Sequence, residues 1–261
     1  MSHKLKNNKK KNLQKFTSNI WDKYYVSQQK GNWVGNEYPT EPLIRYISNL
    51  RKDPKNKIAY FNDAGKELNI KKNFKGNALE IGFGTIANLL FLKKKGFKCK
   101  GLEVSANSVK RAEKYIAKND IKNIKTYFWE NHKVLPFKTN SFDLIVGLQC
   151  IYYNLEFNVF LKEIKRVLKP GGKFFFSFFS NNHDYIKYTD IVDGNKNLVK
   201  WNNKHPNKRI RGSVLFQPKD KKHLKRIFKN FKDINIFTYE FDQLPLFQSW
   251  WYINGINSKK K

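Results

Sequence analysis

A pair of closely spaced glycines is the feature of this chain that points most directly to chemistry. The apolar residues 78–81 lead through Gly82 and Gly84 into a second apolar segment that begins near Thr85. Glycines let the backbone bend sharply and approach a ligand, and the first N–H groups of a following helix point at the same place. The pattern therefore predicts a nucleotide-binding turn. Because Ala87 completes a Gly-x-Gly-x-x-Ala spacing, the turn alone also fits a dinucleotide.

Two carboxylates narrow the choice of ligand. Glu80 lies two residues before Gly82, where it would repel a pyrophosphate but could hold a positively charged amino group. Glu103 ends the next apolar stretch, where a carboxylate can accept both hydroxyl groups of a ribose. Further along, residues 168–173 read Leu-Lys-Pro-Gly-Gly-Lys and separate a helical pattern from a Phe-rich strand. These features favour a ligand with a ribose and a cationic amino group.

Together these residues resemble the class I S-adenosylmethionine-dependent methyltransferases of the small-molecule, type 11-like kind. The resemblance extends over roughly residues 74–256. It implies S-adenosylmethionine as the cofactor and an α/β, Rossmann-like, doubly wound sheet of seven strands, mostly parallel with an antiparallel edge strand. Glu80, Gly82 and Gly84 correspond to the positions that hold the methionine part. Glu103 corresponds to the ribose position, and Val104 to one that covers a face of the adenine.

The resemblance implies two further groups of site residues. The stretch Trp-Glu-Asn-His at residues 129–132 falls near the adenine amine, with Asn131 where the family usually has Asp. The side-chain carbonyl of Asn131 could still act as an acceptor. Gln149, after the fourth expected strand, corresponds to a contact with the methionine end. Tyr152 and Tyr153 fall where related enzymes often carry His.

Methyl transfer from a sulfonium is an in-line displacement, so alignment and exclusion of water matter most, and a hydroxyl acceptor also needs a base. Tyr152 and Tyr153 are catalytic candidates, although a phenol with a pKa of about 10 is a poor base, so they could simply shape the pocket. His183 and Asp184 are the better base candidates, because they follow the fifth strand at the edge where ligands bind. A solvated surface position is the alternative for His183. The His and Cys residues show no spacing that predicts a metal site.

The elements that must position these residues alternate along the chain. Strands are expected at residues 77–82, 98–103, 124–128, 142–148 and 173–179. Helical patterns separate them at residues 85–95, 106–119 and 157–168. This alternation predicts a parallel sheet covered on both faces. Residues 234–239 and 250–256 are expected to close the sheet as an antiparallel pair.

We expect a disordered basic arm at residues 1–15 and an N-terminal helical cap at residues 16–76. The methyltransferase domain is expected at residues 77–257, with a substrate insertion at about residues 181–217. In similar methyltransferases such a cap folds over the cofactor. Most of its aromatic residues are expected in the core. Trp33 and Tyr38 are the exceptions, because the glycines and proline around them predict a loop that can face the acceptor pocket.

The net charge of +31, from 52 Lys and Arg against 21 Asp and Glu, raises the question of nucleic-acid binding. The lysines are spread along the whole chain, which favours solvated faces. Only the basic segment 204–211 is expected to reach an acidic group of the substrate. Cys99 and Cys150 are expected as reduced core residues. Without an apolar run of membrane length or a secretory segment, we expect a cytoplasmic protein that does not enter a membrane.

Three functions remain open at this point. The leading hypothesis is methyl transfer to a small-molecule or sugar-type acceptor, because the chain lacks an appended RNA-binding module. The second is methylation of RNA or protein, driven by the basic surface. The third is an inactive nucleotide-binding module, against which Glu80, the two glycines and Glu103 argue. The oligomeric state is not predicted.

Overall fold

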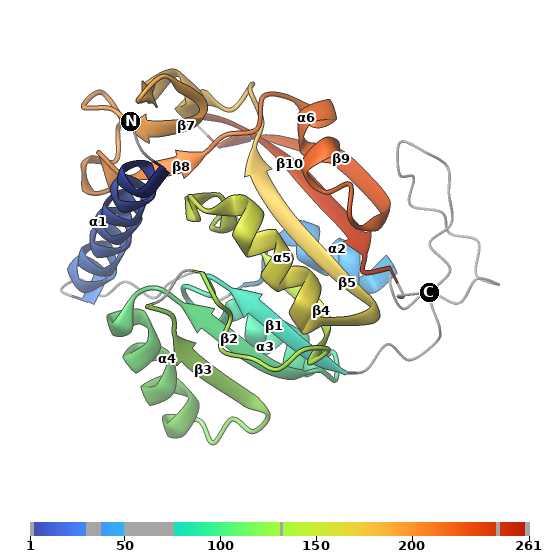
Figure 1. The fold of residues 1–261 in the computed structure, drawn as a ribbon. Coiled ribbons are helices and arrows are strands. Elements are labelled where there is room, and N and C mark those ends of the chain that lie inside the picture. The colour runs from blue at the N-terminus through green and yellow to red at the C-terminus, as the bar shows by residue number, and fades with distance from the viewer. Residues whose placement is uncertain (1–2, 30–37, 50–75, 131–132, 244–245, 259–261) are drawn as a thin grey trace.

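The computed structural model of the 261-residue chain describes residues 3–29, 38–49, 76–130, 133–243 and 246–258 (Figure 1). Seven strands form one sheet in the order β3-β2-β1-β4-β5-β10-β9. They are β1 (Asn77–Ile81), β2 (Lys98–Glu103), β3 (Ile124–Phe128), β4 (Phe142–Gly147), β5 (Leu168–Phe179), β9 (Lys232–Gln243) and β10 (Leu246–Ile256). Neighbours from β3 to β5 are parallel, and β10 is antiparallel to both β5 and β9. The doubly wound fold with an antiparallel strand at this edge is confirmed.

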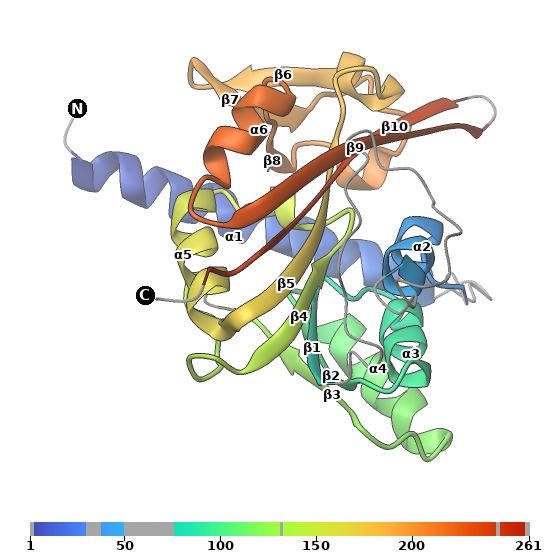
Figure 2. The same ribbon diagram turned by 90° about the vertical axis from the view of Figure 1, so that its right-hand side faces the viewer.

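Helices cover both faces of the sheet. Figure 2 shows α2, α3 and α4 on one side and α5 and α6 on the other. Their bounds are α2 (Glu41–Asn49), α3 (Ala87–Lys94), α4 (Ala106–Lys118), α5 (Phe157–Val167) and α6 (Lys221–Ile227). The apolar stripe of α5 is buried, and its Phe157 ring lies 5.6 Å from that of Phe178 in β5. Phe174 stacks on Phe228 at 5.1 Å. Packing between aromatic rings thus fixes this face of the sheet.

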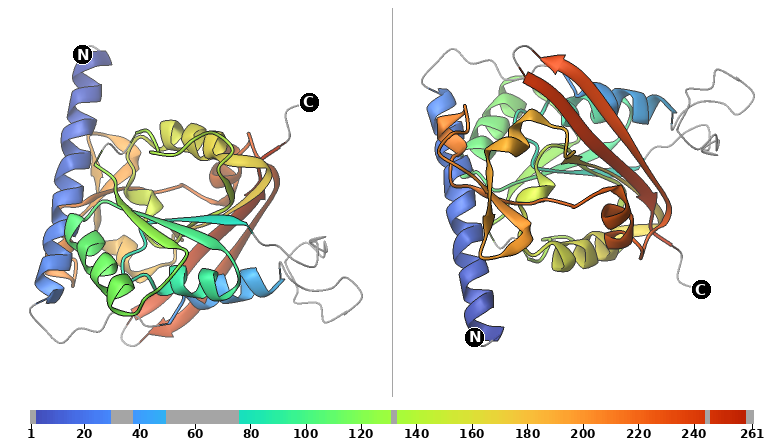
Figure 3. Two further views of the ribbon diagram at one scale, coloured as in Figure 1. Left: turned by 90° about the horizontal axis from the view of Figure 1, so that it is seen from below. Right: turned by 90° about the horizontal axis from the view of Figure 1, so that it is seen from above.

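The first helix, α1 (His3–Gln29), includes residues 3–15, which were expected to be part of a disordered basic arm. Its Gln14 side chain donates a hydrogen bond to the Tyr153 carbonyl at 2.9 Å and accepts one from the Leu155 N–H at 2.7 Å. Figure 3 shows α1 alongside α4 and the insertion. The basic composition of the arm gave no sign of these contacts, because their partners lie far away in the sequence.

The expected insertion carries its own small sheet. Strands β6 (Thr189–Val192), β7 (Asn195–Trp201) and β8 (Val214–Phe216) pair antiparallel in the order β6-β7-β8. Three short 3-10 helices complete this region and the loop after β4: η1 (Ile151–Tyr153), η2 (Asp184–Tyr188) and η3 (Lys208–Ile210). The Val214 N–H donates to the Thr17 hydroxyl oxygen at 3.0 Å, which attaches α1 to the small sheet.

Candidate functional site

The turn between β1 and α3 is as tight as its glycines predict. Gly82 and Gly84 have φ angles of 68° and 50°, in the left-handed region that favours glycine. A Cβ atom on Gly82 would lie 2.5 Å from the Cβ atom of Cys150. On Gly84 it would lie 2.9 Å from the Tyr25 hydroxyl oxygen. A side chain at Gly82 would therefore clash with Cys150, and at both positions the backbone conformation is one that other residues rarely adopt.

A cavity of about 350 Å³ lies along this turn, at the edge where β1, β2 and β4 end. This size falls in the ordinary range for small-molecule sites. Six residues that the sequence assigns to cofactor binding line it: Glu80, Gly82, Gly84, Glu103, Val104 and Gln149. The seventh, Asn131, lies outside the described residues. The fold thus brings together side chains from three separate strand ends.

Glu80 carries the most unusual electrostatics of the site. Its side chain is 1% exposed, and Oε1 accepts a hydrogen bond from the Asn88 amide at 2.8 Å. Within the described residues, Oε2 is buried without a hydrogen-bond partner. Burial raises the pKa of Glu80 to about 8, and nearby Glu103 contributes to the rise. A cationic group beside Oε2 would remove this penalty, so the residue fits the ammonium group of a methionine moiety.

Glu103 is bound to the turn by backbone groups. Its Oε2 accepts a hydrogen bond from the Gly84 N–H at 3.1 Å, and Oε1 accepts from Val104 at 2.7 Å and Ser105 at 3.3 Å. Burial still raises its pKa, although these three hydrogen bonds act in the opposite direction. Each carboxylate oxygen can accept more than one hydrogen bond, so Glu103 retains capacity for ribose hydroxyls. The residues present fit both polar ends of S-adenosylmethionine.

Helix α1 supplies a side of the cavity that the sequence analysis missed. Trp21, Tyr24 and Tyr25 all line it, although their helical spacing favoured the core. Tyr38 also lines it, as expected, and is 80% exposed. Trp33 lies outside the described residues. The helical spacing of these three aromatic residues predicts a shared face of α1, but it does not predict that this face lies against the cavity.

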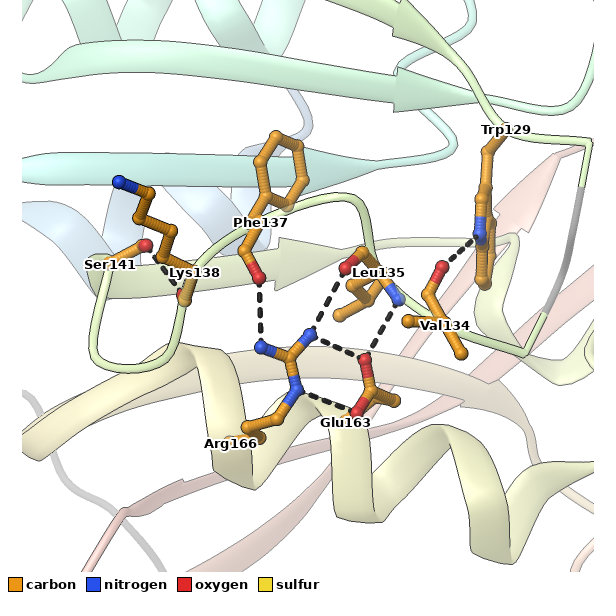
Figure 4. Close-up of polar contacts among 8 residues, drawn as sticks. All are labelled: Trp129, Val134, Leu135, Phe137, Lys138, Ser141, Glu163 and Arg166. Atoms are coloured by element: carbon orange, nitrogen blue, oxygen red, sulfur yellow. Dashed lines mark hydrogen bonds and ion pairs between the residues drawn. The ribbon is translucent and has the colours of Figure 1, made fainter.

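A hydrogen-bonded network sets the position of Trp129, another residue of the cavity lining (Figure 4). The Trp129 indole N–H donates to the Val134 carbonyl at 3.0 Å. Arg166 of α5 donates to the Leu135 carbonyl at 3.0 Å, and the Leu135 N–H donates to Glu163 at 2.9 Å. The segment after β3 is thereby held against α5. This network orients the indole ring beside the cavity.

The two candidate tyrosines have different positions. Tyr153 lines the cavity, and its hydroxyl oxygen accepts a hydrogen bond from the Trp201 indole at 3.0 Å. Tyr152 is buried outside the lining, and its hydroxyl group donates to the Gln149 carbonyl at 2.8 Å. Burial raises the pKa of both phenols, that of Tyr152 well above its ordinary value. Neither is suited to act as a base at neutral pH.

His183 does not line the cavity, contrary to the expectation from sequence. It is 2% exposed, and its Nδ1 accepts a hydrogen bond from the Tyr185 N–H at 3.0 Å. Nε2 therefore carries the proton and donates to the Gln248 side-chain oxygen at 2.8 Å. Burial lowers the pKa of His183 to about 4. Both ring nitrogens are engaged, so His183 is a structural residue that joins the loop after β5 to β10.

The basic segment 204–211 also lies away from the cavity lining. Its Arg211 guanidinium donates to the His205 carbonyl at 2.8 Å, within the same loop. Across the described residues, no group of His, Cys, Asp and Glu is placed to hold a metal ion. Within the same part of the chain, no helix combines the length and apolar character needed to cross a membrane.

The fold is a doubly wound α/β domain with a cavity at the carboxyl ends of its parallel strands, and comparison with known proteins finds similar methyltransferases. A family model described as a methyltransferase domain matches residues 79–176. A sterol 4-C-methyltransferase of Caenorhabditis elegans is 27% identical over 135 residues, which are 52% of this chain and 38% of the relative. Norajmaline N-methyltransferase of Rauvolfia serpentina is 29% identical over 97 residues, 37% of this chain and 33% of the relative.

A crystal structure of a methyltransferase from Methanosarcina mazei shares the fold, with a TM-score of 0.58 at 19% identity over 70% of this chain and 93% of that one. The part of the chain that matches the methyltransferase-domain model contains the glycine turn and Glu103. The chain spans less than half the length of each of the two curated relatives that it matches.

Proposed function

We propose that this protein transfers a methyl group from S-adenosylmethionine to a small-molecule acceptor. The observation that carries the proposal is the buried Glu80 carboxylate, whose Oε2 has no hydrogen-bond partner among the described residues and which lines the cavity with Glu103. When bound, S-adenosylmethionine supplies an electrophilic methyl group on a sulfonium.

The chain itself supplies binding, orientation and exclusion of water. Glu80 would hold the ammonium group and Glu103 the ribose hydroxyls, as their donors and acceptors require. Val104 and Trp129 line the cavity near Glu103 and offer apolar faces to an adenine ring. Helix α1 forms one side of the cavity, which keeps water from the reacting groups.

Two observations favour a small acceptor over RNA. Among the described residues that line the cavity there is no Lys or Arg, although the chain has a net charge of +31. Phosphate groups of a nucleic acid would normally be bound by such cations. The curated relatives are named for methylation of a sterol and of an alkaloid.

Calorimetry with S-adenosylmethionine, its demethylated product and NAD tests the cofactor assignment. We expect micromolar binding of the first two and none of NAD. Binding of NAD alone would contradict the proposal. For the acceptor, purified protein and labelled cofactor would be incubated with a cell extract, and metabolites and RNA would be separated before detection. Label confined to RNA would replace the small-molecule proposal with the alternative.

A further inference from the structure

The cavity has an aromatic wall, formed by Trp21, Tyr24 and Tyr25 of α1 and Tyr153 of η1. The Trp21 ring contacts two of these rings edge-on, with centroids 5.2 Å from Tyr24 and 5.0 Å from Tyr153. Tyr24 and Tyr25 are 5.6 Å apart in the same arrangement. Trp201 of β7 donates a hydrogen bond to the Tyr153 hydroxyl oxygen, so the insertion holds the wall at Tyr153, where α1 contacts it.

The charges of the lining, as far as the structure describes it, give an anionic acceptor no partner. The described lining contains the carboxyl groups of Glu80 and Glu103, and no Lys, Arg or His among the residues the structure describes there. Arg111 lies 5.5 Å from the centre of the Tyr25 ring but does not line the cavity. An acceptor that carries phosphate or carboxylate would find no counter-charge in this lining. Glu80 and Glu103 are taken up by the cofactor, so the aromatic side chains remain to attract a cation.

The described lining also offers no group suited to remove a proton from an alcohol. Burial raises the pKa of Tyr25, Tyr153 and Cys150, so these groups stay protonated at neutral pH. Glu103 is engaged by three backbone N–H groups, and Glu80 lies at the glycine turn. His183 lies outside the cavity with both ring nitrogens bonded. An acceptor that reacts without losing a proton beforehand fits this chemistry best.

We propose that the acceptor is an uncharged amine, and that the aromatic wall holds the ammonium product. This inference rests on the proposed function. The nitrogen lone pair attacks the methyl carbon, the new C–N bond forms as the C–S bond breaks, and that electron pair remains on sulfur. The positive charge thus passes from sulfur to nitrogen, and a nitrogen that bears hydrogen then loses a proton to solvent. Because charge is moved rather than created, the uncharged amine needs no base in the pocket, and an amine that is protonated in solution loses that proton to water before it binds.

Calorimetry on the protein saturated with the demethylated cofactor tests the wall directly. Choline is the cationic probe, and 3,3-dimethyl-1-butanol is its uncharged counterpart of the same shape. We expect choline to bind at least about fivefold more tightly. Trp21→Leu should bring the ratio close to one, whereas Trp21→Phe should keep most of it. A merely structural effect of the substitution would weaken the binding of both probes equally and leave the ratio of their affinities unchanged.

Equal or weaker binding of choline by the wild-type protein would overturn the amine proposal. So would attachment of the labelled methyl group to oxygen, sulfur or carbon in the product isolated from an extract. Both results leave the proposed function intact, because the demethylated cofactor still binds. Failure of the wild-type protein to bind that cofactor contradicts the proposed function itself.

Discussion

The carboxylate of Asp22 accepts a hydrogen bond from the hydroxyl group of Ser105 at 2.6 Å, and this contact joins α1 to the residue that caps α4. The Ser105 hydroxyl oxygen in turn accepts from the Ser108 N–H at 3.1 Å. Asp22 also accepts from the backbone and side chain of Asn107, at 3.2 and 2.8 Å. A carboxylate at the start of a helix is favoured by the helix dipole. Asp22 is thus one of the side chains that fix α1, the helix that lines one side of the cavity.

Replacement of Asp22 by Ala should therefore weaken both the fold and ligand binding. We expect a loss of about 1 to 3 kcal/mol in the free energy of unfolding, measured in urea, since the partners of a charged acceptor are left unpaired. Affinity for S-adenosylmethionine should fall as well, because α1 lines the cavity. The control is Glu113→Ala, which removes an exposed carboxylate of α4. Equal effects of the two substitutions would contradict this role.

The same contact has a defined pH dependence. Burial of Asp22 opposes ionisation, but the hydrogen bonds from Ser105 and Asn107 prevail and lower its pKa. Because the folded pKa lies below the unfolded value of about 3.9, the contact stabilises the protein above that pH. Its contribution should disappear as the pH falls further. Urea unfolding at pH 3 and pH 6 should show a smaller difference between wild type and Asp22→Ala at pH 3.

Glu80→Gln should stabilise the ligand-free protein at pH 8. The folded pKa of about 8 lies above the unfolded value of about 4.3, so the folded state binds more protons between these values. Stability then falls as the pH rises through that window. The variant lacks this ionisation, and its free energy of unfolding at pH 8 should exceed that of wild type by about 2 kcal/mol or more. Unchanged stability would show that the carboxyl group is better solvated than its burial indicates.

The gain from Glu80→Gln should be offset by a loss of function, as is common where a buried charge serves a ligand. Calorimetry should show affinity for S-adenosylmethionine reduced about tenfold or more, since a charge-assisted hydrogen bond is removed. Glu113→Gln is the matched control on an exposed surface. Full affinity in Glu80→Gln would remove Glu80 from the binding site.

Gly82→Ala and Gly194→Ala separate backbone strain from steric contact. Both glycines have a φ angle of 68°, but a Cβ atom on Gly194 meets nothing within 4 Å, whereas on Gly82 it meets Cys150 at 2.5 Å. Gly194→Ala should cost about 1 to 2 kcal/mol, the strain of the left-handed conformation. Gly82→Ala should cost at least about 1 kcal/mol more and should reduce cofactor binding. Similar losses in the free energy of unfolding for the two variants would show that the segment around Cys150 shifts easily to accommodate the added methyl group.

His183→Ala should lower stability while leaving turnover per folded molecule nearly unchanged. The substitution leaves the Gln248 side chain and the Tyr185 N–H without their partner, at a cost of about 1 to 3 kcal/mol. Burial holds the pKa of His183 at about 4, below the unfolded value of about 6.5, so its stabilising effect is lost as the pH falls between these values. Urea unfolding at pH 5 and 7 and initial rates measure the two effects. A hundredfold loss of turnover would restore His183 as a base.

Most of the sheet could be predicted because its signals are local. Apolar strands alternate with helical stripes, and the observed β4 at Phe142–Gly147 differs by one residue from the expected 142–148. The start of β5 could not be predicted. Lys-Pro-Gly-Gly looks like a turn, yet β5 begins at Leu168, because Leu168 pairs with Phe142 and the Gly171 N–H donates to the Asn257 carbonyl at 2.9 Å. A residue far along the chain keeps this segment extended.

The site divides in the same way. The glycine turn, Glu80 and Glu103 could be found from sequence, because a strand, a turn and a helix that are adjacent in the chain position them. The aromatic wall could not, since α1 is held beside the cavity by Asp22, Gln14 and Thr17, whose partners are distant in the sequence. His183 lies at the sheet edge that the sequence predicts, but its side chain is buried against β10 and does not line the cavity. The Gln248 side chain that holds it belongs to β10, which the sequence does not connect with this loop.

The attachment of α1 to β8 has a consequence for the order in which the protein is built. Thr17 and Val214 are 197 positions apart, so a ribosome completes α1 long before its partner strand exists. The partners of α1 at Ser105 and Tyr153 are made earlier, so the contact with β8 is the later of these attachments. A nascent chain that stops before Val214 can form β1 to β5, but α1 then lacks its attachment to the small sheet. The docking of the helix that lines the cavity is therefore completed only after most of the chain has been made.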